Sequence, residues 1–599
     1  MGQAQPVDDP TNPDAQQAQP GAGRRGGRGG GGGRGQPAAV PLPPTTQAAT
    51  RGNSFQNVTL YGAVGDGKTI DSDAINKAID AASALGGGTV YFPPGVYHSY
   101  TIRLKSNITL YLDHGARILA APVGINEKGY DLPEPNPEGG NYQDGGHSHW
   151  KNSLIWAIGE ENIAIVGQGI IDGSGLQTGD GGTPGGRGGG FGPGGGGRGG
   201  RGGRGRGGDG AVPVTQPDDA AAQGGRRGGR GGAADPNTPP PTYSVGNKAL
   251  ALKLCRNVTI RDVSFYRGGH FAILATGVDN MTVTNVKFDT NRDAFDIDSC
   301  RNMRMSDCSV NAPNDDAVVL KASYGLGFAR ACENITISNC LVSGYEIGSL
   351  LDGTYKPLDR RVPDGMGPTG RIKFGTESNG GFKNITITNC VFDHSRGLAL
   401  ETVDGGLLED VTISNITMRH TSNSPIFLRL GARMRGPEGV PVGELRRINI
   451  SNIVVYDAEP RYASIIAGIP NHHIEDVKLS NIWIQYKGGG TAEQAAITPP
   501  EQENGYPEPA RLGEMPAYGF YIRHAKNIEM NNIEISFEEP EARPAFVMED
   551  VQGIELNNVK AEIGEGVPRF FLKDVSDFTA FRVRGIADVH KEKVEAEKF

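Results

Sequence analysis

The chain has 599 residues, enough for one large core or an array of repeats, and its formal net charge is −9. A negative balance argues against nucleic acid or an anionic membrane as the main partner of the folded part. No apolar stretch is long enough to span a bilayer, and the six cysteines have no Cys-x-x-Cys metal-binding spacing.

The glycine excess lies mainly in two segments. Residues 1–50 are rich in Gly, Pro and Gln, and residues 176–242 contain "GGRGGGFGPGGGGRGGRGGRGRGGDG". Neither segment can bury enough apolar surface to offset the entropy of ordering, so both are predicted to be disordered. Arg-Gly-Gly runs can bind single-stranded nucleic acid. We favour a flexible linker, because no nucleic-acid-binding fold accompanies them.

Between these segments, "YGAVGDGKTIDSDAINKAIDAASALGGGTVYFPPGVY" predicts an amphipathic helix from about Asp71 to Leu85. Gly86 ends the helix, and one of its faces is apolar, carrying Ala74, Ile75, Ala78, Ile79 and Ala82. Such a helix can cap the open end of a stack of strands, whose exposed edge would otherwise invite aggregation.

One pattern then recurs along the chain, as in "NVTIRDVSF" at Asn257, "NMTVTNVKF" at Asn280 and "NITISNCLV" at Asn334, and the series continues to Gly553. Apolar residues alternate on each side of a fixed position that is usually Asn, with a period of roughly 22–26 residues where no insertion intervenes. This alternation excludes helical repeats and predicts short strands joined by turns. Stacked coils then form parallel sheets around one interior, so the fold class is an all-β, single-stranded parallel β-helix.

The repeat predicts two columns of side chains. One is a ladder of hydrogen-bonded amides that runs from coil to coil through Asn339, Asn389, Asn415, Asn452 and Asn481. The other is a column of small buried thiols, comprising Cys300, Cys308, Cys332, Cys340 and Cys390, within which the sequence leaves a disulfide open. The solenoid is predicted to span residues 51–585, interrupted by 176–242 and followed by a charged tail at 586–599.

Three carboxylates stand out in "NRDAFDIDSCRNMRMSDCSVNAPNDDAVVLK". Asp315 and Asp316 are adjacent, and Asp293 lies about one repeat upstream, so neighbouring coils bring the three together. Clustered carboxylates repel one another, which keeps one protonated while the others stay ionised. Inverting glycosidases need such an acid and base roughly 6.5–9.5 Å apart. A solvated acidic turn is the alternative, and the repeat spacing disfavours it.

The opening "YGAVGDG…PPGVY" resembles the pectin-acting β-helix superfamily, and "NRDAFDID…NDDAVVLK" resembles the N-T-D…D-D core of glycoside hydrolase family 28, the polygalacturonases and rhamnogalacturonan hydrolases. The resemblance covers most of residues 54–585. It implies a right-handed β-helix, inverting hydrolysis of an α-linked galacturonide, and no metal or other cofactor. It also implies that Asp315 is the general acid, that Asp293 and Asp316 position and deprotonate water, and that Lys321 binds substrate or holds Asp316.

Two motifs of that family are absent. Its G-H-G histidine has no clear counterpart, and Arg371 or Lys373 falls near that place, where we expect both to bind substrate. Its later R-I-K is replaced by "LALETV", with Glu401 where the Lys would be. A carboxylate there should repel a neighbouring galacturonate and can accept hydrogen bonds from a neutral sugar. Long loops at 344–371 and 485–517 are expected to wall off one end of the cleft. Together these departures favour exo action on rhamnogalacturonan or an oligogalacturonide.

Several interpretations remain paired with a simpler alternative. For Glu401, the alternative to contact with a sugar is a pairing with Arg396 or Arg371. For His270, the two interpretations are substrate binding and the anchoring of a loop. Arg429, with Arg433 and Arg435, binds uronate carboxylates or belongs to a solvated basic loop. The remaining candidates are expected to stack on sugar, pack a loop, support the acids or lie at the surface: His147, His149, Trp150, Asp296 and Asp298.

Other functions on the same fold stay open at this point: a polygalacturonase proper, a calcium-dependent polysaccharide lyase, a non-catalytic sugar-binding or adhesive protein, and an isomerase or epimerase. The acid pattern favours hydrolysis. We expect a pectic polysaccharide or oligosaccharide as partner, a monomer, and no nucleic-acid or membrane partner. The N-terminus lacks the apolar core of a signal peptide, and its polar composition favours a secreted or periplasmic protein whose leader has been removed.

Overall fold

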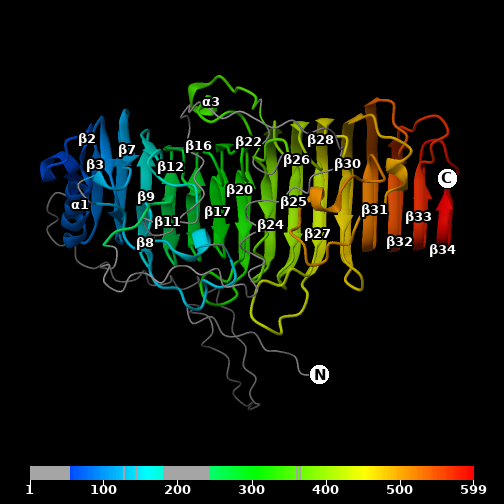
Figure 1. The fold of residues 1–599 in the computed structure, drawn as a ribbon, viewed down its shortest axis with the longest axis horizontal. Helices are drawn as coiled ribbons and strands as arrows, with labels where there is room; N and C mark the ends of the chain where they lie inside the picture. Colours follow the sequence, from blue (N-terminus) through cyan, green and yellow to red (C-terminus); the bar gives the residue numbers. More distant parts are fainter. Residues whose placement is uncertain are drawn as a thin grey trace, which may run out of the picture. The chain divides into compact units, whose positions relative to one another are not determined.

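The structure is a computed structural model, and it describes residues 54–599 except 126–127, 144, 180–241, 359, 361 and 363–365. Residues 1–50 and nearly all of 176–242, the two segments predicted to be disordered, lie outside the described residues. The described residues form a right-handed parallel β-helix whose coils follow one another in chain order, with α1 near one end and β34 at the other (Figure 1). The predicted fold class is therefore confirmed.

The strands pair in parallel from coil to coil in ladders. The first ladder leads to the candidate site and contains β5 (Ile102–Arg103), β8 (Ile155–Ile158), β11 (Lys248–Lys253), β14 (Phe271–Thr276), β17 (Phe295–Asp298), β20 (Val318–Lys321), β23 (Ile372–Phe374), β25 (Leu398–Thr402), β27 (Ile426–Leu430) and β29 (Ser464–Ala467). The second contains β1 (Phe55–Asn57), β3 (Gly88–Phe92), β6 (Ile108–Leu112), β9 (Glu161–Gly167), β12 (Arg256–Arg261), β15 (Asp279–Thr284), β18 (Arg301–Ser306) and β21 (Cys332–Ser338).

The third ladder contains β2 (Asp66–Ile70), β4 (Gly95–Ser99), β7 (Ala116–Ala120), β10 (Ile170–Asp172), β13 (Ser264–Tyr266), β16 (Lys287–Asp289), β19 (Ser309–Asn311) and β22 (Leu341–Ser343). Farther along, the strands of one coil run together through their turns as β24 (Phe382–Asp393), β26 (Leu407–Thr421), β28 (Glu444–Ala458), β30 (Ile474–Gly488), β31 (Phe520–Glu539), β32 (Phe546–Ala561) and β33 (Phe570–Phe581). The helical elements are α1 (Ser72–Ala84), α3 (Ser349–Asp352), α4 (Pro509–Leu512), and the 3-10 turns η2 (Val58–Tyr61), η4 (Gly145–Ser148) and η5 (Gln494–Ala496).

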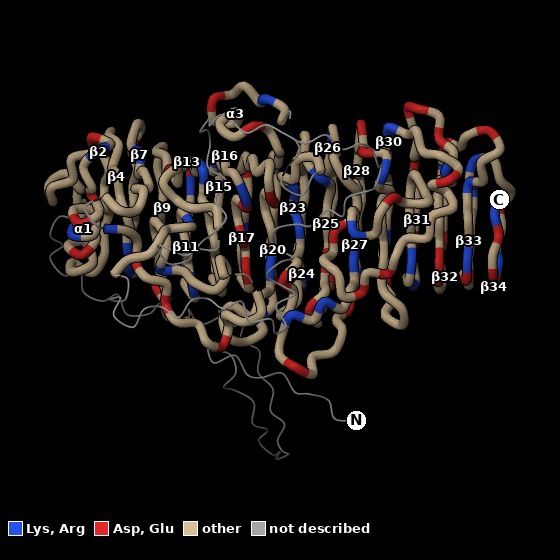
Figure 2. The backbone as a smooth tube through the Cα atoms, viewed as in Figure 1, with Lys and Arg blue, Asp and Glu red and all other residues tan. Residues whose placement is uncertain are grey.

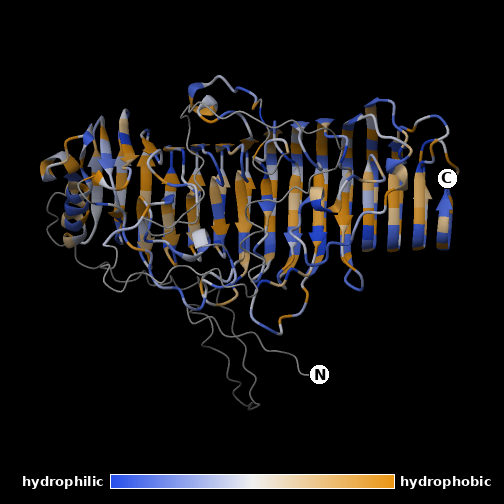
Figure 3. Ribbon diagram, in the orientation of Figure 1, coloured by the Kyte–Doolittle hydropathy of each residue, from blue (hydrophilic) through white to orange (hydrophobic). Residues whose placement is uncertain are grey.

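The core follows from the two-residue alternation. In β18, for example, Met303 and Met305 are buried while Arg304 between them is exposed. Hydrophobic residues recur in this way along the strands of the whole stack (Figure 3). The first ladder differs, because β14, β17, β20, β23, β25, β27 and β29 are buried at every position. Polar side chains on the outer face of this ladder therefore lie under other parts of the chain.

The predicted Asn ladder is present. Each side-chain amide donates to the preceding rung, with distances of 3.2 Å from Asn389 to Asn339, 3.0 Å from Asn415 to Asn389, 3.0 Å from Asn452 to Asn415 and 3.0 Å from Asn481 to Asn452. These residues adopt left-handed backbone conformations, with φ between 54° and 57°, which Asn tolerates better than most residues do. The predicted cysteines are free and buried as expected, but the register divides them into two columns, Cys300 with Cys332 and Cys308 with Cys340 and Cys390.

The two ends of the stack are closed differently. At the N-terminal end, α1 lies within a residue of its predicted bounds and buries the five predicted apolar side chains in the core. At the C-terminal end, the segment predicted as a charged tail instead forms β34 (Val589–Lys598), which pairs antiparallel with β33. Phe599 packs there against Phe570 and Phe578. This strand has almost no hydrophobic pattern, because Val594 is its one buried residue.

Replacing Asn452 with Ala should lower the free energy of unfolding by about 1–2 kcal/mol, because it removes two rungs of the ladder and places a Cβ residue at positive φ without a compensating bond. Asn452→Gly loses the same hydrogen bonds but not the backbone preference, so it should cost less. Urea denaturation of both variants checks this, and equal losses would show that the backbone term is negligible.

Candidate active site

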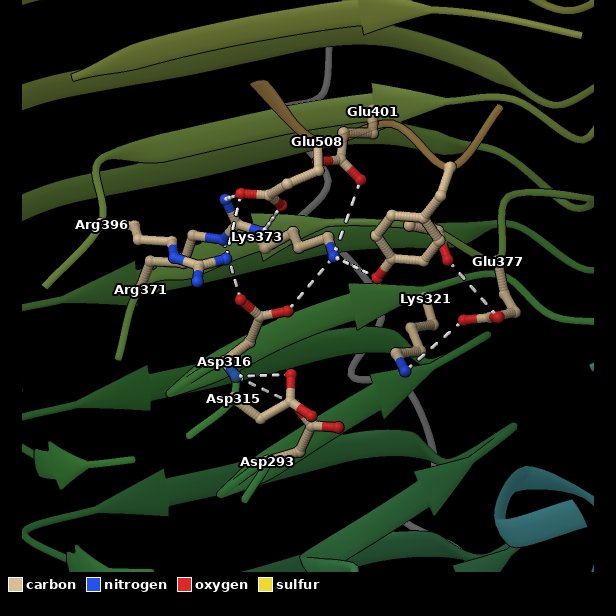
Figure 4. Close-up of polar contacts among 12 residues, drawn as sticks. Asp293, Asp315, Asp316, Lys321, Arg371, Lys373, Glu377, Arg396, Glu401 and Glu508 are labelled. Carbon is tan, nitrogen blue, oxygen red and sulfur yellow. Dashed lines mark hydrogen bonds and ion pairs between the residues drawn. The ribbon is translucent and has the colours of Figure 1, made fainter. Parts of the chain in front are cut away.

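The three aspartates lie in the turns that lead into β17 and β20. Stacking places Asp293 beside Asp316, whose backbone N–H donates to Asp293 Oδ1 at 3.1 Å. One carboxylate oxygen from each of Asp293, Asp315 and Asp316 lies within 4.8 Å of the other two (Figure 4). The spacing of one repeat does bring the acids together. The arrangement is tighter than the roughly 6.5–9.5 Å associated with inverting glycosidases.

Two of the predicted substrate-binding cations hold Asp316. Arg371 Nε donates to Asp316 Oδ1 at 2.8 Å, and Lys373 Nζ lies 3.3 Å from Asp316 Oδ2 (Figure 4). Lys321, for which the sequence left this role open, instead lies 2.7 Å from His147 Nε2, 3.4 Å from Asp296 and 3.5 Å from Glu377. Figure 2 shows acidic and basic residues along the whole stack, including the coils from β17 to β27.

Glu508, which the sequence analysis missed, is a central member of the cluster. Its carboxylate accepts hydrogen bonds from Arg371 Nη2 at 2.8 Å, Arg396 Nη1 at 3.0 Å and Asn423 Nδ2 at 2.9 Å. Burial alone would raise its pKa, but the two guanidinium charges outweigh this effect and lower the pKa to about 2. Glu508 comes from the 485–517 loop, which lies outside the repeat pattern and therefore gave no signal.

The 485–517 loop is anchored over β23 to β27 at its middle and toward its C-terminal end. Toward its C-terminal end, Leu512 and Met515 pack with Ala399 and Phe427 in a second hydrophobic cluster. At its middle, Arg429 donates to the carbonyls of Glu501 and Gln502 at 2.6 and 3.1 Å. The guanidinium of Arg429, a predicted carboxylate ligand, thus holds the loop.

Glu401 is completely buried beneath this loop. Lys373 Nζ lies 3.7 Å from Glu401 Oε2, and Tyr506 OH lies 3.4 Å from the same nitrogen. The cation beside Glu401 is thus Lys373, not Arg396 or Arg371 as the alternative reading of the sequence had it. Within the part of the chain that the structure describes, neither carboxylate oxygen of Glu401 has a hydrogen-bond partner. Burial raises the pKa of Glu401 to about 8, although the charges of Lys373 and Arg371 partly oppose the shift.

The other candidates have packing roles. His270 Nδ1 lies 2.8 Å from the Thr178 carbonyl, which is the loop-anchoring alternative. His147 Nε2 lies 2.8 Å from Asp296 Oδ2, and Trp150 donates its indole N–H to Thr276 at 3.0 Å. Both Asp296 and Asp298 are fully buried, so they support the site from below and do not lie at the surface.

A second residue that the sequence analysis missed is Arg292, which stands where the family motif has Thr. Its Nη2 donates to Asp315 Oδ2 at 2.9 Å. Burial would raise the pKa of Asp315, but the charges of Arg292 and Lys373 outweigh it and hold the pKa well below the usual value. The pKa of Asp293 is instead raised well above its usual value, by burial and then by the charges of Asp315 and Asp296. In the free site these opposite shifts favour protonation of Asp293 over that of Asp315, the expected acid.

Two groups in the described part of the chain have donor atoms close enough to hold a metal ion. One is the acid cluster itself, whose charge is already countered by Arg292, Arg371 and Lys373. The other is Asp393, His394 and His420, at the outer turn after the third ladder.

Comparison with known proteins also indicates a pectin-lyase-like β-helix. Residues 55–137 match the family model "Rhamnogalacturonase A/epimerase, pectate lyase-like", and residues 242–355 match "Right handed beta helix region". An exo-poly-alpha-D-galacturonosidase from Dickeya chrysanthemi is 37% identical over 123 residues, 20% of this chain and 19% of that protein. Plasmin and fibronectin-binding protein A from Streptococcus pneumoniae is 51% identical over 76 residues, 12% of this chain and 10% of that protein. The chain therefore matches a fifth or less of the length of these two relatives.

Among solved structures, a family 28 exopolygalacturonase from Yersinia enterocolitica superposes with a TM-score of 0.54 at 18% identity, covering 84% of this chain and 78% of that chain. Fold and similarities together define a pectin-lyase-like right-handed β-helix. Its similar proteins include polygalacturonases of glycoside hydrolase family 28, at low identity. No helix among the described residues is long and apolar enough to cross a membrane.

Replacing Glu401 with Gln should flatten the pH dependence of stability. The folded chain holds the Glu401 proton up to a pKa of about 8, against an ordinary value of 4.5. As pH rises through this window the unfolded chain loses its proton first, so the free energy of unfolding of the native protein falls, by about 1.4 kcal/mol per pKa unit. Gln cannot ionise, and the variant should gain relative stability above that window.

Urea unfolding at pH values of about 5 and about 9 measures the effect. Glu555→Gln, at an exposed position of β32, is the matched control. Parallel stability curves for the native protein and Glu401→Gln would contradict the shift.

Proposed function

We propose that the protein is a glycoside hydrolase that cleaves an α-linked galacturonide bond of a pectic polysaccharide from the chain end, in rhamnogalacturonan or an oligogalacturonide. The observation that carries this proposal is the group of three aspartates on neighbouring coils, of which Asp293 has a raised pKa and Asp315 a lowered one. Glycoside hydrolysis needs this combination of an acid and a base at one site.

The contacts support distinct roles for the three acids. Asp316 is fixed at both oxygens by Arg371 and Lys373, and it lies against Asp293. We assign Asp316 and Asp293 to positioning and deprotonating the attacking water. Asp315 is the more exposed member and lies at the open edge of the cluster, where it can reach the leaving oxygen as general acid.

Charge balance favours hydrolysis over a calcium-dependent lyase. Calcium sites need several anionic oxygens that are not already paired. Here Arg292 holds Asp315, and Arg371 and Lys373 hold Asp316. A divalent cation would have to compete with these charges, whereas a neutral water between the acids would not.

The 485–517 loop supports exo action and a neutral neighbouring sugar. Glu508 occupies Arg371 and Arg396, Tyr506 lies over Lys373, and backbone carbonyls occupy Arg429. Each cation on this side of the acids is thus engaged by the protein itself. These cations are therefore not available to bind the carboxylate of a second uronate. We keep the preference for a neutral neighbouring sugar, but we attribute it to these engaged cations and not to direct contact with Glu401.

Incubation with polygalacturonate and with rhamnogalacturonan oligosaccharides tests the proposal. The native protein should release saturated galacturonate, preferentially from the rhamnose-containing substrate. Asp315→Asn should reduce the rate by about 10²–10⁴-fold, because it removes the proton donor. Asp577→Asn, at an exposed position of β33, should leave the rate unchanged. An unsaturated, ultraviolet-absorbing product would identify a lyase, and carbohydrate binding without any product would identify a binding protein.

The family resemblance predicts a first-formed sugar of the inverted, β configuration, from a water that attacks between Asp293 and Asp316 opposite the leaving group, although the nearest oxygens of the acids lie closer together than inverting glycosidases usually place their carboxyl groups. Proton NMR during the first minutes of the reaction distinguishes the anomers. An α product would assign Asp316 as a nucleophile instead.

A further inference from the structure

The Arg292–Asp315 pair is the exposed edge of a buried charge cluster. The side chains of Arg292 and Asp315 are 24% and 29% exposed. The other charged side chains of the cluster are at most 9% exposed, namely Asp316, Lys321, Arg371, Lys373, Glu377, Arg396, Glu401 and Glu508. A ligand that approaches the acids along the solvent-accessible side therefore meets Arg292 and Asp315 first.

The guanidinium of Arg292 is also held in place by its remaining nitrogen, Nη1. Its Nη1 donates to the Thr178 carbonyl at 3.2 Å and lies 3.0 Å from His270 Nδ1. Its Nε and Nη2 both point at Asp315 Oδ2, at 3.3 and 2.9 Å. Two adjacent N–H groups directed at one carboxylate form the fork that also binds a ligand carboxylate bidentately.

This pairing conflicts with the role of Asp315. A general acid must carry a proton when the glycosidic bond breaks, but a guanidinium at hydrogen-bond distance favours the ionised carboxylate. Titratable groups from neighbouring coils and the covering loop surround Asp315. The cations are Arg292, Lys321 and Lys373, and the carboxyls are Asp293 and Asp316. Tyr506 and, beyond Arg292, the imidazole of His270 complete the set. Of these groups, Arg292 is the one both hydrogen-bonded to Asp315 and reachable from solvent.

We propose that Arg292 recognises the carboxylate of the galacturonate to be released, and that it leaves Asp315 to do so. The proton then moves from Asp293 to Asp315, whose oxygens lie within 4.8 Å of one another. Asp293 becomes an ionised base beside Asp316, and Asp315 becomes the acid. The substrate arrives as an anion and no proton enters or leaves the site, so charge and protons balance. This inference rests on the proposed function.

Arg292 is thereby a specificity-determining residue. A galacturonate methyl ester carries no charge to draw Arg292 away from Asp315, so it should bind without turning Asp315 into the acid. The enzyme then rejects the ester mainly in kcat, and not only in KM, because the ester lacks the interaction that converts the free site into the reactive one.

Binding of the monosaccharides separates recognition from turnover. By calorimetry, the native protein should bind galacturonate about 10- to 100-fold more tightly than its methyl ester. Arg292→Gln should abolish this preference, and Arg292→Lys, which keeps the charge but loses the fork, should retain part of it. Arg256→Gln, which breaks an exposed pair with Glu161 on β9, is the matched control and should bind as the native protein does.

The heat of galacturonate binding should be the same in buffers of different ionisation enthalpy, because the proton moves within the site. A heat that depends on the buffer would overturn the internal transfer. Retention of the full preference by Arg292→Gln would overturn the recognition.

Kinetics with terminally esterified and free oligosaccharides provide the second readout. The ratio of kcat for acid over ester should fall toward one in Arg292→Gln. If the native protein binds galacturonate in this Arg292-dependent way but hydrolyses nothing, the proposed function fails and the recognition stands. If it hydrolyses the substrate and the variant keeps the native ratio, the function stands and this inference fails.

Discussion

The structure depends on the constraint that each coil lies directly on the previous one. Parallel strands keep neighbouring coils about 4.8 Å apart, and the backbone ladder fixes which residue lies above which. Asp293 and Asp316 meet only because their coils are in register, and Arg371 reaches Asp316 because it begins the next coil of the same ladder. The Asn ladder maintains the same register on the opposite side of each coil. A one-residue slip in a single coil would break the amide ladder and the acid cluster together.

That constraint explains how much the sequence could predict. The alternation, the recurring Asn and the period define the coils, so the fold class, the capping helix and the meeting of the three aspartates could be predicted. The partners of those aspartates could be predicted in part, since Arg371 and Lys373 also belong to the repeat.

The features that the sequence did not predict either lie outside the repeat or depend on which of several nearby side chains pair with one another. Glu508 and Tyr506 come from a loop with no periodicity, and only the folded chain shows that they lie over Lys373 and Arg371. The antiparallel β34 escaped for a similar reason, because one buried residue makes no pattern. Arg292 was visible as a departure from the family motif, but its effect on Asp315 depends on side-chain geometry that no spacing encodes.

Glu508 also changes how the solenoid behaves as a polymer. A stack of repeats normally has only nearest-neighbour coupling, so it can fray or fold coil by coil. The ion pair between Glu508 and Arg371 joins residues 137 positions apart in the sequence, and the same loop passes over several coils on the way. This long-range ion pair couples the coils from β23 to β30 into one cooperative unit. Loss of order near β30 would then also free the buried cations near β23. The coils that carry the three aspartates are then coupled to coils well beyond them, and they should lose their order together.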